Sequence, residues 1–467
     1  MSTKTDLATY FTGKIAESRI LKDPDSLAFY GKDWLARYTP NASLVLLPES
    51  EEEVSEIIKT CAANNLAVVP SGGRTGLSGG ATAQNGEIII SLERMRKILD
   101  VNPIDRTIRC QAGTTLEALQ NAAKDNGLFF PVDFSSRGSA QIGGAIATNA
   151  GGIRVIKYGS FRESVRGLRA VLGTGEVVSI NGSLVKNNSG YDLKNLLIGS
   201  EGTLGIITEA TLTLTSPPND TARILCGLES VSAVTELLAY CHKTTLDISA
   251  FEYMEALPYQ EVLKHRGLKS PLSSTYSAYV LIECEVTHSA QREEIQQVFL
   301  QAFEQQLIVD VVVSESSAQA EELMNLRDLI SETLSQHHTL HKNDIAVPIP
   351  AIPAFIQDLH ALLQKRYPDF QVALFGHVGD GNIHVNVLKP QNLSDELFRA
   401  QCHEADHDIF SLIQQHKGTI SAEHGIGLLK ADFLSYTRST AEIALMRGIK
   451  KLFDPQAILN PGKVLRA

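Results

Sequence analysis

Three features are missing from this sequence, and each absence excludes a class of protein. No run of residues approaches the roughly 18 apolar residues of a membrane-spanning helix. The net charge is −11 with no concentrated basic face, so no nucleic-acid partner is expected, because a phosphate backbone requires one. Residues 1–6 lack the apolar core of a signal peptide and the arginines of a transit peptide, which makes a cytoplasmic location the expectation.

Closely spaced cysteines are missing as well. Without a CxxC pair, neither a disulfide framework nor a zinc–cysteine, iron–sulfur or haem site is expected. Any electrons from a redox cofactor must then leave to a separate carrier. Six cysteines are expected in reduced form in the core: Cys61, Cys110, Cys226, Cys241, Cys284 and Cys402.

The 467 residues exceed one ordinary hydrophobic core, so two large domains are expected. Residues 43–218 alternate between strand-like and helix-like runs, which indicates an α+β or α/β domain. Pro217-Pro218 breaks this pattern, and strands with amphipathic helices follow. The predicted domains are 1–218, 219–420 and a C-terminal segment, 421–467.

The most informative stretch is 375–387, which places two histidines symmetrically about Asp380-Gly381. A two-residue hairpin turn at that dipeptide would pair His377 with His384. Directly opposed residues have Cβ atoms about 5 Å apart, which suits two imidazoles binding one divalent ion. Turn chemistry explains Asp380 better than a ligand role does.

Glu423 and His424 supply a candidate second half of such a site, a carboxylate beside an imidazole. The alternative interpretation is that all four side chains are polar residues facing solvent. Their joint occurrence favours a metal site.

Glycine is concentrated at 70–81, 143–152 and 199–208. Glycine lets backbone N–H groups converge on an anion and lets the main chain approach a flat ring. No Rossmann GxGxxG and no P-loop occurs, yet three such loops in one domain favour a nucleotide cofactor.

These segments resemble the PCMH-type FAD-binding domain of the vanillyl-alcohol-oxidase flavoproteins. Over nearly the whole chain, the sequence is similar to their D-2-hydroxy-acid dehydrogenase branch. The motifs that carry the resemblance are 70–81, 138–152 with Tyr158-Gly159, 190–208, 375–387, 421–425 and 459–462. The resemblance implies an α+β fold: a two-part FAD-binding domain, an α+β substrate cap, and a C-terminal helical return packed near the flavin.

The resemblance also implies non-covalent FAD, because relatives with covalent flavin commonly use a histidine in or near the first loop, and none lies between residues 70 and 81. Loop 72–76 would cradle the pyrophosphate, 201–207 would follow the adenosine, and Asn460 would lie near the ring. The implied FAD-binding residues are Pro70, Ser71, Gly72, Gly73, Arg74, Thr75, Gly76, Leu77, Gly79, Pro131, Asp133, Ser136, Gly138, Gly143, Gly144, Ala147, Thr148, Asn149, Gly151, Gly152, Tyr158, Glu201, Gly202, Gly205, Ile206, Ile207 and Asn460.

Oxidation of a 2-hydroxy acid requires loss of the hydroxyl proton and hydride transfer from C2 to the flavin. A divalent metal chelated by the substrate would acidify the hydroxyl, with His377, His384 and Glu423 as ligands. The resemblance favours zinc, although manganese, cobalt or iron would accept the same ligands. His424 is expected to be the catalytic base and also to contact the substrate.

The expected substrate residues are Arg327, Ser331, Lys342 and Asn386. Arg327 and Ser331 stand four apart in a predicted helix, 321–334, and so would share a face. Their spacing to Lys342 is similar to that of D-2-hydroxyglutarate dehydrogenases, in which these cations hold the distal carboxylate, although threonine is usual where Ser331 stands here. The alternative interpretation is a solvated helix face.

Two rival functions stay open. One is a D-lactate or glycolate dehydrogenase of the same family; the other is a flavin-binding subunit without its own chemistry. The family suggests an electron-transfer flavoprotein or a quinone as electron acceptor. The resemblance makes D-2-hydroxyglutarate the expected substrate, with D-malate as a second one. A homodimer is the expected assembly.

Overall fold

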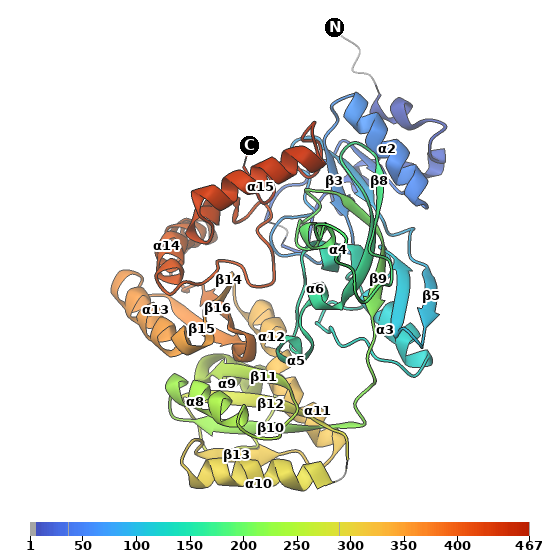
Figure 1. The fold of residues 1–467 in the computed structure, drawn as a ribbon. Helices are drawn as coiled ribbons and strands as arrows, with labels where there is room; N and C mark the ends of the chain where they lie inside the picture. The colour runs from blue at the N-terminus through green and yellow to red at the C-terminus, as the bar shows by residue number, and fades with distance from the viewer. Residues whose placement is uncertain (1–5, 36, 289, 467) are drawn as a thin grey trace. The chain divides into compact units, whose positions relative to one another are not determined.

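The computed structural model describes residues 6–35, 37–288 and 290–466 (Figure 1). The chain forms two compact units. Unit 1 comprises Met1–Gly152, Gly159–Pro217 and Glu423–Ala467, and unit 2 comprises Ile153–Tyr158 and Pro218–Ala422. Residues 1–5, on which the expectation about a targeting segment largely rests, lie outside the described residues. No helix in the described ranges is long and apolar enough to cross a membrane.

Unit 1 contains a four-stranded sheet and a five-stranded sheet. The first has the order β1 (Ile20–Leu21), β2 (Leu44–Leu46), β4 (Ile88–Ser91), β3 (Val68–Ser71), with the last three strands parallel. The second is antiparallel, in the order β5 (Ile98–Asn102), β6 (Thr107–Gln111), β9 (Ile206–Thr213), β7 (Val165–Val171), β8 (Val177–Ile180). One apolar cluster joins both sheets.

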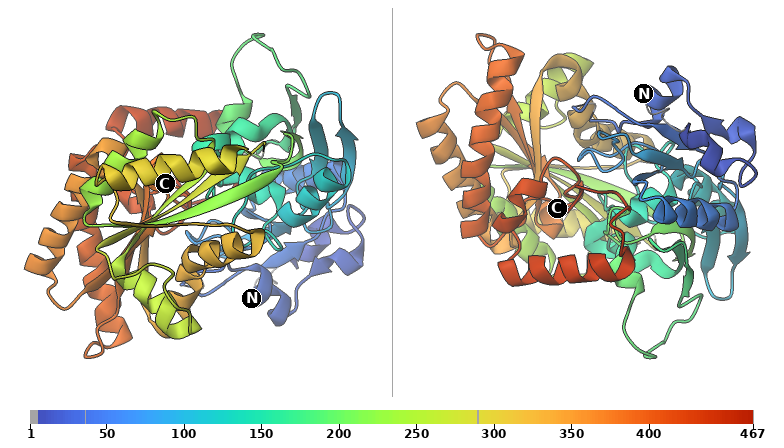
Figure 2. Two further views of the ribbon diagram at one scale, coloured as in Figure 1. Left: turned by 90° about the horizontal axis from the view of Figure 1, so that it is seen from below. Right: turned by 90° about the horizontal axis from the view of Figure 1, so that it is seen from above.

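Several helices of unit 1 begin after a residue whose side chain accepts a hydrogen bond from a backbone N–H group of the first turn. Ser50 and Thr115 accept hydrogen bonds at the N-termini of α2 and α3, as their side chains predict. The helices are α1 (Pro24–Tyr30), α2 (Glu51–Ala63), α3 (Leu116–Asp125), α4 (Ile142–Ala147), α6 (Phe161–Ser164), α7 (Lys194–Leu197) and α15 (Thr440–Phe453), with 3-10 turns at Leu7–Phe11, Glu17–Arg19 and Ala431–Tyr436. Residues 181–193 form an exposed loop (Figure 2).

The C-terminal segment packs back onto unit 1. Leu459 forms a parallel bridge with Val68, at the start of β3. The Lys450 ammonium, on α15, donates to the carbonyl oxygens of Thr203 and Leu459, both at 2.7 Å. The end of the chain is therefore fixed beside the first and third glycine-rich loops.

Unit 2 is built on a seven-stranded antiparallel sheet. Its order is β13 (Asp310–Val313), β10 (Asp220–Leu228), β12 (Ala278–Val286), β11 (Ile248–Glu255), β15 (Gln371–Gly376), β16 (Asn382–Leu388), β14 (Leu340–Ala346). Its helices are α5 (Val155–Tyr158), α8 (Val231–Cys241), α9 (Ala256–Arg266), α10 (Ala290–Glu304), α11 (Ser317–Asp328), α12 (Ile330–His337), α13 (Ile352–Arg366) and α14 (Asp395–Gln415), with 3-10 turns at Ile349–Ala351 and Val378–Asp380.

One apolar cluster of unit 2 joins helices α9, α11 and α12 to strands β10, β11, β12 and β15. Helix α10 lies along the β10–β13 edge of the sheet (Figures 1 and 2), and α13 lies between α8 and α14. All six cysteines are buried.

Candidate active site

The turn that carries His377 differs from the predicted two-residue hairpin. His384 pairs with Phe375 across β15 and β16, rather than with His377. A 3-10 turn over Val378–Asp380 makes the connection longer, and the N–H groups of Asp380 and Asn382 donate to the His377 carbonyl. The predicted register was therefore wrong by two residues.

The two imidazoles nevertheless meet. A shift of two residues keeps the side chain on the same face of a sheet, because the strand period is two. The ring centroids of His377 and His384 lie 5.3 Å apart at an interplanar angle of 83°. Asp380 accepts a hydrogen bond from the Asn382 N–H at 3.1 Å, in agreement with the turn interpretation, and burial raises its pKa to about 6.

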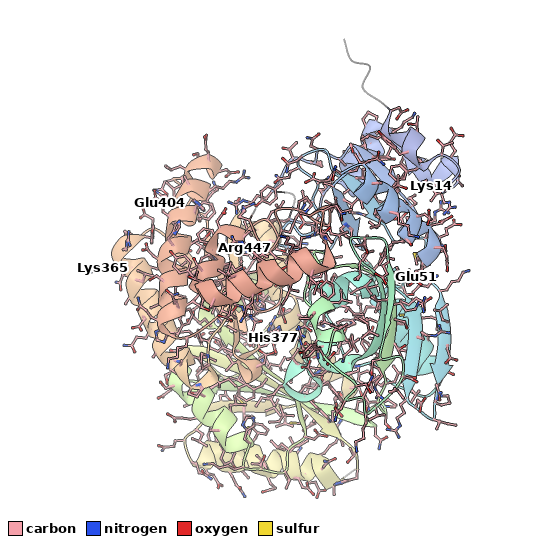
Figure 3. All side chains as sticks on the ribbon, turned by 45° about the horizontal axis from the view of Figure 1, so that its top comes forward. Lys14, Glu51, Lys365, His377, Glu404 and Arg447 are labelled. Atoms are coloured by element: carbon pink, nitrogen blue, oxygen red, sulfur yellow. The ribbon has the colours of Figure 1, made fainter. Side chains whose placement is uncertain are left out.

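A buried carboxylate that the sequence did not reveal orients His377. Glu252, on β11, contacts His377 Nδ1 at 2.6 Å and Arg327 Nε at 2.7 Å. Burial raises the pKa of Glu252, but the nearby His377 and Arg327 outweigh it and bring the value to about 2. His377 is buried, whereas Lys365 on α13 and Glu404 on α14, also labelled in Figure 3, are exposed. A carboxylate on Nδ1 fixes the imidazole ring and leaves Nε2 as the metal-facing nitrogen of such an arrangement.

The predicted helix 321–334 is two helices. Helix α11 ends at Asp328 and α12 begins at Ile330, with Leu329 between them. Arg327 is buried, with its guanidinium 4.8 Å from the Phe375 ring centroid, while Ser331 is exposed. The two side chains do not share a face, because the break at Leu329 ends the i,i+4 relationship.

Strands β14 and β16 bring four polar side chains onto one face. Their register pairs Lys342 with Asn386 and Asp344 with His384. Each pair stands two residues from the other, so all four side chains point the same way. Burial lowers the pKa of Lys342, whose ammonium donates to Ser335 on α12 at 2.8 Å. Burial also lowers the pKa of His384 to about 4, so its imidazole is neutral at neutral pH, the form that binds a metal.

Asp344 also fixes the chain just before the second predicted half-site. Its Oδ2 accepts a hydrogen bond from the Ala422 N–H at 3.1 Å, and its Oδ1 accepts one from Asn382 Nδ2 at 2.8 Å. Glu423 follows Ala422 directly, and consecutive Cα atoms are about 3.8 Å apart. Glu423 and His424 themselves belong to unit 1.

The glycine-rich loops of unit 1 come together. A Cβ on Gly73 would lie 2.0 Å from the Ser139 carbonyl oxygen, so only glycine fits there. A Cβ on Gly72 would lie 3.6 Å from the Cα of Gly144, in the second glycine-rich segment. A Cβ on Gly202, at φ +71°, would lie 3.1 Å from Pro70. The first loop thus contacts both of the others.

Polar atoms without partners line this junction, which fits a bound polar cofactor. Among the described residues, the buried atoms without a hydrogen-bond partner include Ser71 Oγ, Gln141 Oε1 and Asn460 Oδ1. Nothing lies within 4 Å of a Cβ built on Gly144. Orphaned buried groups are costly, and the oxygens and N–H groups of FAD would satisfy them.

Glu201 ties the third loop to the segment after His424. Its carboxylate accepts hydrogen bonds from the N–H groups of Ile426 at 2.7 Å and Gly427 at 2.8 Å. Its carbonyl accepts from Asn460 Nδ2 at 2.7 Å. Burial raises the pKa of Glu201 to about 7. The predicted adenosine-side loop therefore also positions residues 425–427.

Tyr158 is the one predicted cofactor residue that belongs to unit 2, where its hydroxyl donates to Glu285. The sequence does not indicate that 153–158 leaves unit 1. Glu252 was missed too, although a lone carboxylate in the apolar run 250–254 was a usable signal.

Comparisons with known proteins agree with these observations. Residues 42–181 match the family described as an FAD binding domain, and residues 217–464 match the C-terminal domain of the FAD linked oxidases. A D-2-hydroxyglutarate dehydrogenase from Xanthomonas citri pv. viticola is 49% identical, over 96% of this chain and 94% of that protein. One from Stutzerimonas stutzeri is 42% identical, over 97% of each. The mitochondrial one from Arabidopsis thaliana is 36% identical, over 98% and 81%.

Two solved structures show the same fold at low identity. p-Cresol methylhydroxylase aligns with a TM-score of 0.78 at 14% identity, over 99% of this chain and 97% of that one. Alkyldihydroxyacetonephosphate synthase aligns with a TM-score of 0.75 at 17% identity, over 98% and 86%. The predicted α+β fold of the vanillyl-alcohol-oxidase type is confirmed.

Proposed function

The chain belongs to the FAD-linked D-2-hydroxyglutarate dehydrogenases, and we propose that it oxidises D-2-hydroxyglutarate, and also D-malate, to the 2-oxo acid. The register of β14 and β16 is the observation that supports this substrate class. It sets Lys342 and Asn386 on the same face as His384, two residues further along the paired strands. A dicarboxylate needs two recognition points separated along one surface.

Lys342 and Asn386 would hold the distal carboxylate. The ammonium supplies the charge and the amide supplies a directional N–H donor. Arg327 would add a second cation, although its Nε already contacts Glu252. Ser331 is a weaker candidate because it is exposed on α12.

FAD, when bound, supplies the acceptor for the hydride that leaves C2, at flavin N5. The three glycine-rich loops would hold its pyrophosphate and ring against the orphaned polar atoms of unit 1. The reduced flavin would be reoxidised by an electron-transfer flavoprotein or a quinone.

A divalent cation, zinc by preference, would be held by His377, His384 and Glu423, and when bound supplies positive charge that acidifies the substrate hydroxyl. Glu252 contacts His377 through Nδ1, so Nε2 would be the ligating atom. His424 would accept the hydroxyl proton, since an imidazole titrates near neutral pH.

The test is anaerobic bleaching of the flavin absorbance in the FAD-loaded protein. D-2-hydroxyglutarate should bleach the flavin in zinc-replete protein and fail to do so within the same time after treatment with a chelator. Restored bleaching on addition of zinc would support the metal assignment. Equal bleaching with and without metal would exclude it, and no bleaching in any state would exclude the substrate.

A further inference from the structure

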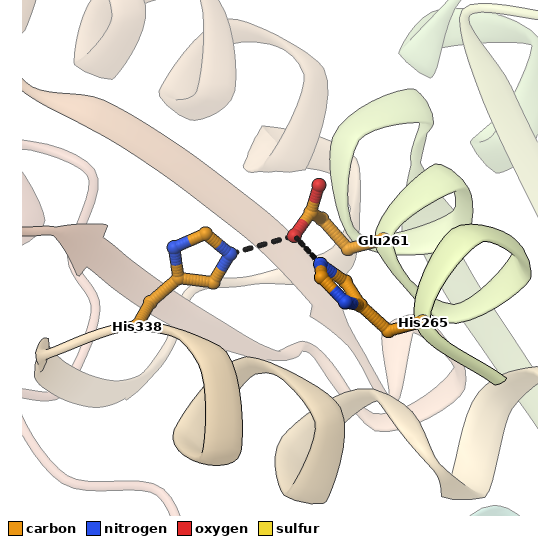
Figure 4. A group of neighbouring side chains, drawn as sticks. All are labelled: Glu261, His265 and His338. Atoms are coloured by element: carbon orange, nitrogen blue, oxygen red, sulfur yellow. Dashed lines mark hydrogen bonds and ion pairs between the residues drawn. The ribbon is translucent and has the colours of Figure 1, made fainter.

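Unit 2 carries a second cluster of side chains of the kind that bind metals, outside the residues assigned above (Figure 4). The Nε2 atoms of His265 and His338 both approach Oε2 of Glu261, at 3.1 Å and 2.6 Å. All three candidate ligand atoms lie within 4.8 Å of one another. We propose that this cluster is a second divalent-metal site, which takes Zn²⁺.

The fold holds the three side chains in place without a metal. Glu261 and His265 stand four residues apart on α9 and therefore share a face. His338 follows the last residue of α12 directly, as its C-cap. The two helices pack against each other through a buried apolar cluster that includes Val262 and Leu334. The ligands are thus fixed by the core beneath them rather than by flexible loops.

The donor atoms suit zinc. Two imidazole nitrogens and one carboxylate oxygen make up one of the three-ligand sets of zinc sites that keep a fourth position for water. Tetrahedral bonds of about 2.0–2.1 Å place neighbouring ligand atoms about 3.4 Å apart. The observed separations of 2.6 and 3.1 Å need only a small outward movement to admit the ion.

The surroundings favour a cation that arrives from solvent. Side-chain exposure is 12% for Glu261, 21% for His265 and 28% for His338, so the site is accessible and partly desolvated. Lys264 approaches Oε1, the other carboxylate oxygen of Glu261. The His337 ring stacks on His265 at 3.7 Å and restricts its rotation.

Zinc binding to the FAD-loaded protein tests the site independently of activity. The variant His377→Ala/His384→Ala removes the active-site ligands proposed above, and calorimetric titration with Zn²⁺ alone should still show one equivalent bound. Adding His338→Ala should abolish this binding or weaken it well beyond about tenfold, since even outer partners of a metal site contribute 10–100-fold.

The matched control is His360→Ala in the same background. His360 also contacts a carboxylate, Glu255 at 2.8 Å, but belongs to no three-ligand cluster among the residues that the structure describes. That variant should keep the full equivalent of zinc. In the wild-type background, elemental analysis should fall by one zinc with His338→Ala, which keeps the test valid if the double variant does not fold. No zinc in the double variant, or no change with His338→Ala in either background, would show that the cluster is an ion-pair network only.

Discussion

Arg327 and Glu252 form a buried ion pair, with Nε and Oε2 2.7 Å apart and both side chains at most 6% exposed. The same carboxylate contacts His377 at 2.6 Å through its other oxygen. Arg327 is thus linked through one carboxylate to a proposed metal ligand. Its first role is to neutralise Glu252.

Arg327→Met should therefore destabilise the protein strongly. Removing one partner of a buried ion pair leaves an uncompensated charge and costs about 3–5 kcal/mol. Adding Glu252→Gln should recover most of this loss, because the buried carboxylate that Arg327 neutralised is then an uncharged amide. Urea unfolding measures the free energy of unfolding of the single and the double variant. Arg438→Met, which removes an exposed pair with Glu442, is the control and should cost less than about 1 kcal/mol. If Arg327→Met and Arg438→Met lowered the free energy of unfolding by similar amounts, the role of Arg327 would be contradicted.

Glu252→Gln alone should weaken metal binding at the proposed active site. Outer partners that orient a ligating imidazole contribute 10–100-fold to metal affinity, and a loss of about that size is expected. Competition with a chromophoric chelator, in a His338→Ala background that removes the second proposed site, measures the affinity. Unchanged affinity would mean that the Glu252–His377 contact does not orient a metal ligand.

Gly425→Ala should be more damaging than an ordinary substitution at a glycine with positive φ. Gly425 has φ +79°, and an added Cβ would lie 2.8 Å from the Glu201 carboxylate carbon. The strain of the left-handed backbone costs about 1–2 kcal/mol and the steric clash about 1–3 kcal/mol more. Gly86→Ala is the matched control, since Gly86 has φ +81° with nothing within 4 Å of its Cβ. Equal loss of unfolding free energy in the two variants would show that Glu201 does not constrain this segment.

The fold class and the meeting of His377 with His384 could both be predicted from the sequence. For the two histidines the reason is the period of a β-strand. An error of two residues in strand register keeps every side chain on its face, so the two imidazoles meet although the predicted pairing and turn were wrong. The loop length could not be predicted, because Asp380-Gly381 supports both a two-residue turn and the last step of a 3-10 turn.

Two other features depend on packing between distant segments. Helices α11 and α12 break at Leu329 with no glycine or proline to mark the break. Residues 153–158 join unit 2 because Ile153 packs on its apolar cluster and Ile156 packs against Gly379. The role of Glu252 depends equally on the pairing of β11 with β15, which no local pattern specifies.

Steady-state kcat/KM for D-2-hydroxyglutarate and D-lactate, in zinc-replete wild type and Lys342→Met, tests the proposed substrate class most directly. Wild type should strongly prefer D-2-hydroxyglutarate. Lys342→Met should lower kcat/KM for D-2-hydroxyglutarate by about 10–100-fold, because one hydrogen bond to a charged group contributes about 1.5–3 kcal/mol. The kcat/KM for D-lactate should stay nearly unchanged. Lys365→Met, which removes an exposed lysine on α13, should change neither. Equal use of D-lactate by wild type, or equal losses for both substrates in Lys342→Met, would contradict a dicarboxylate site on the β14–β16 face.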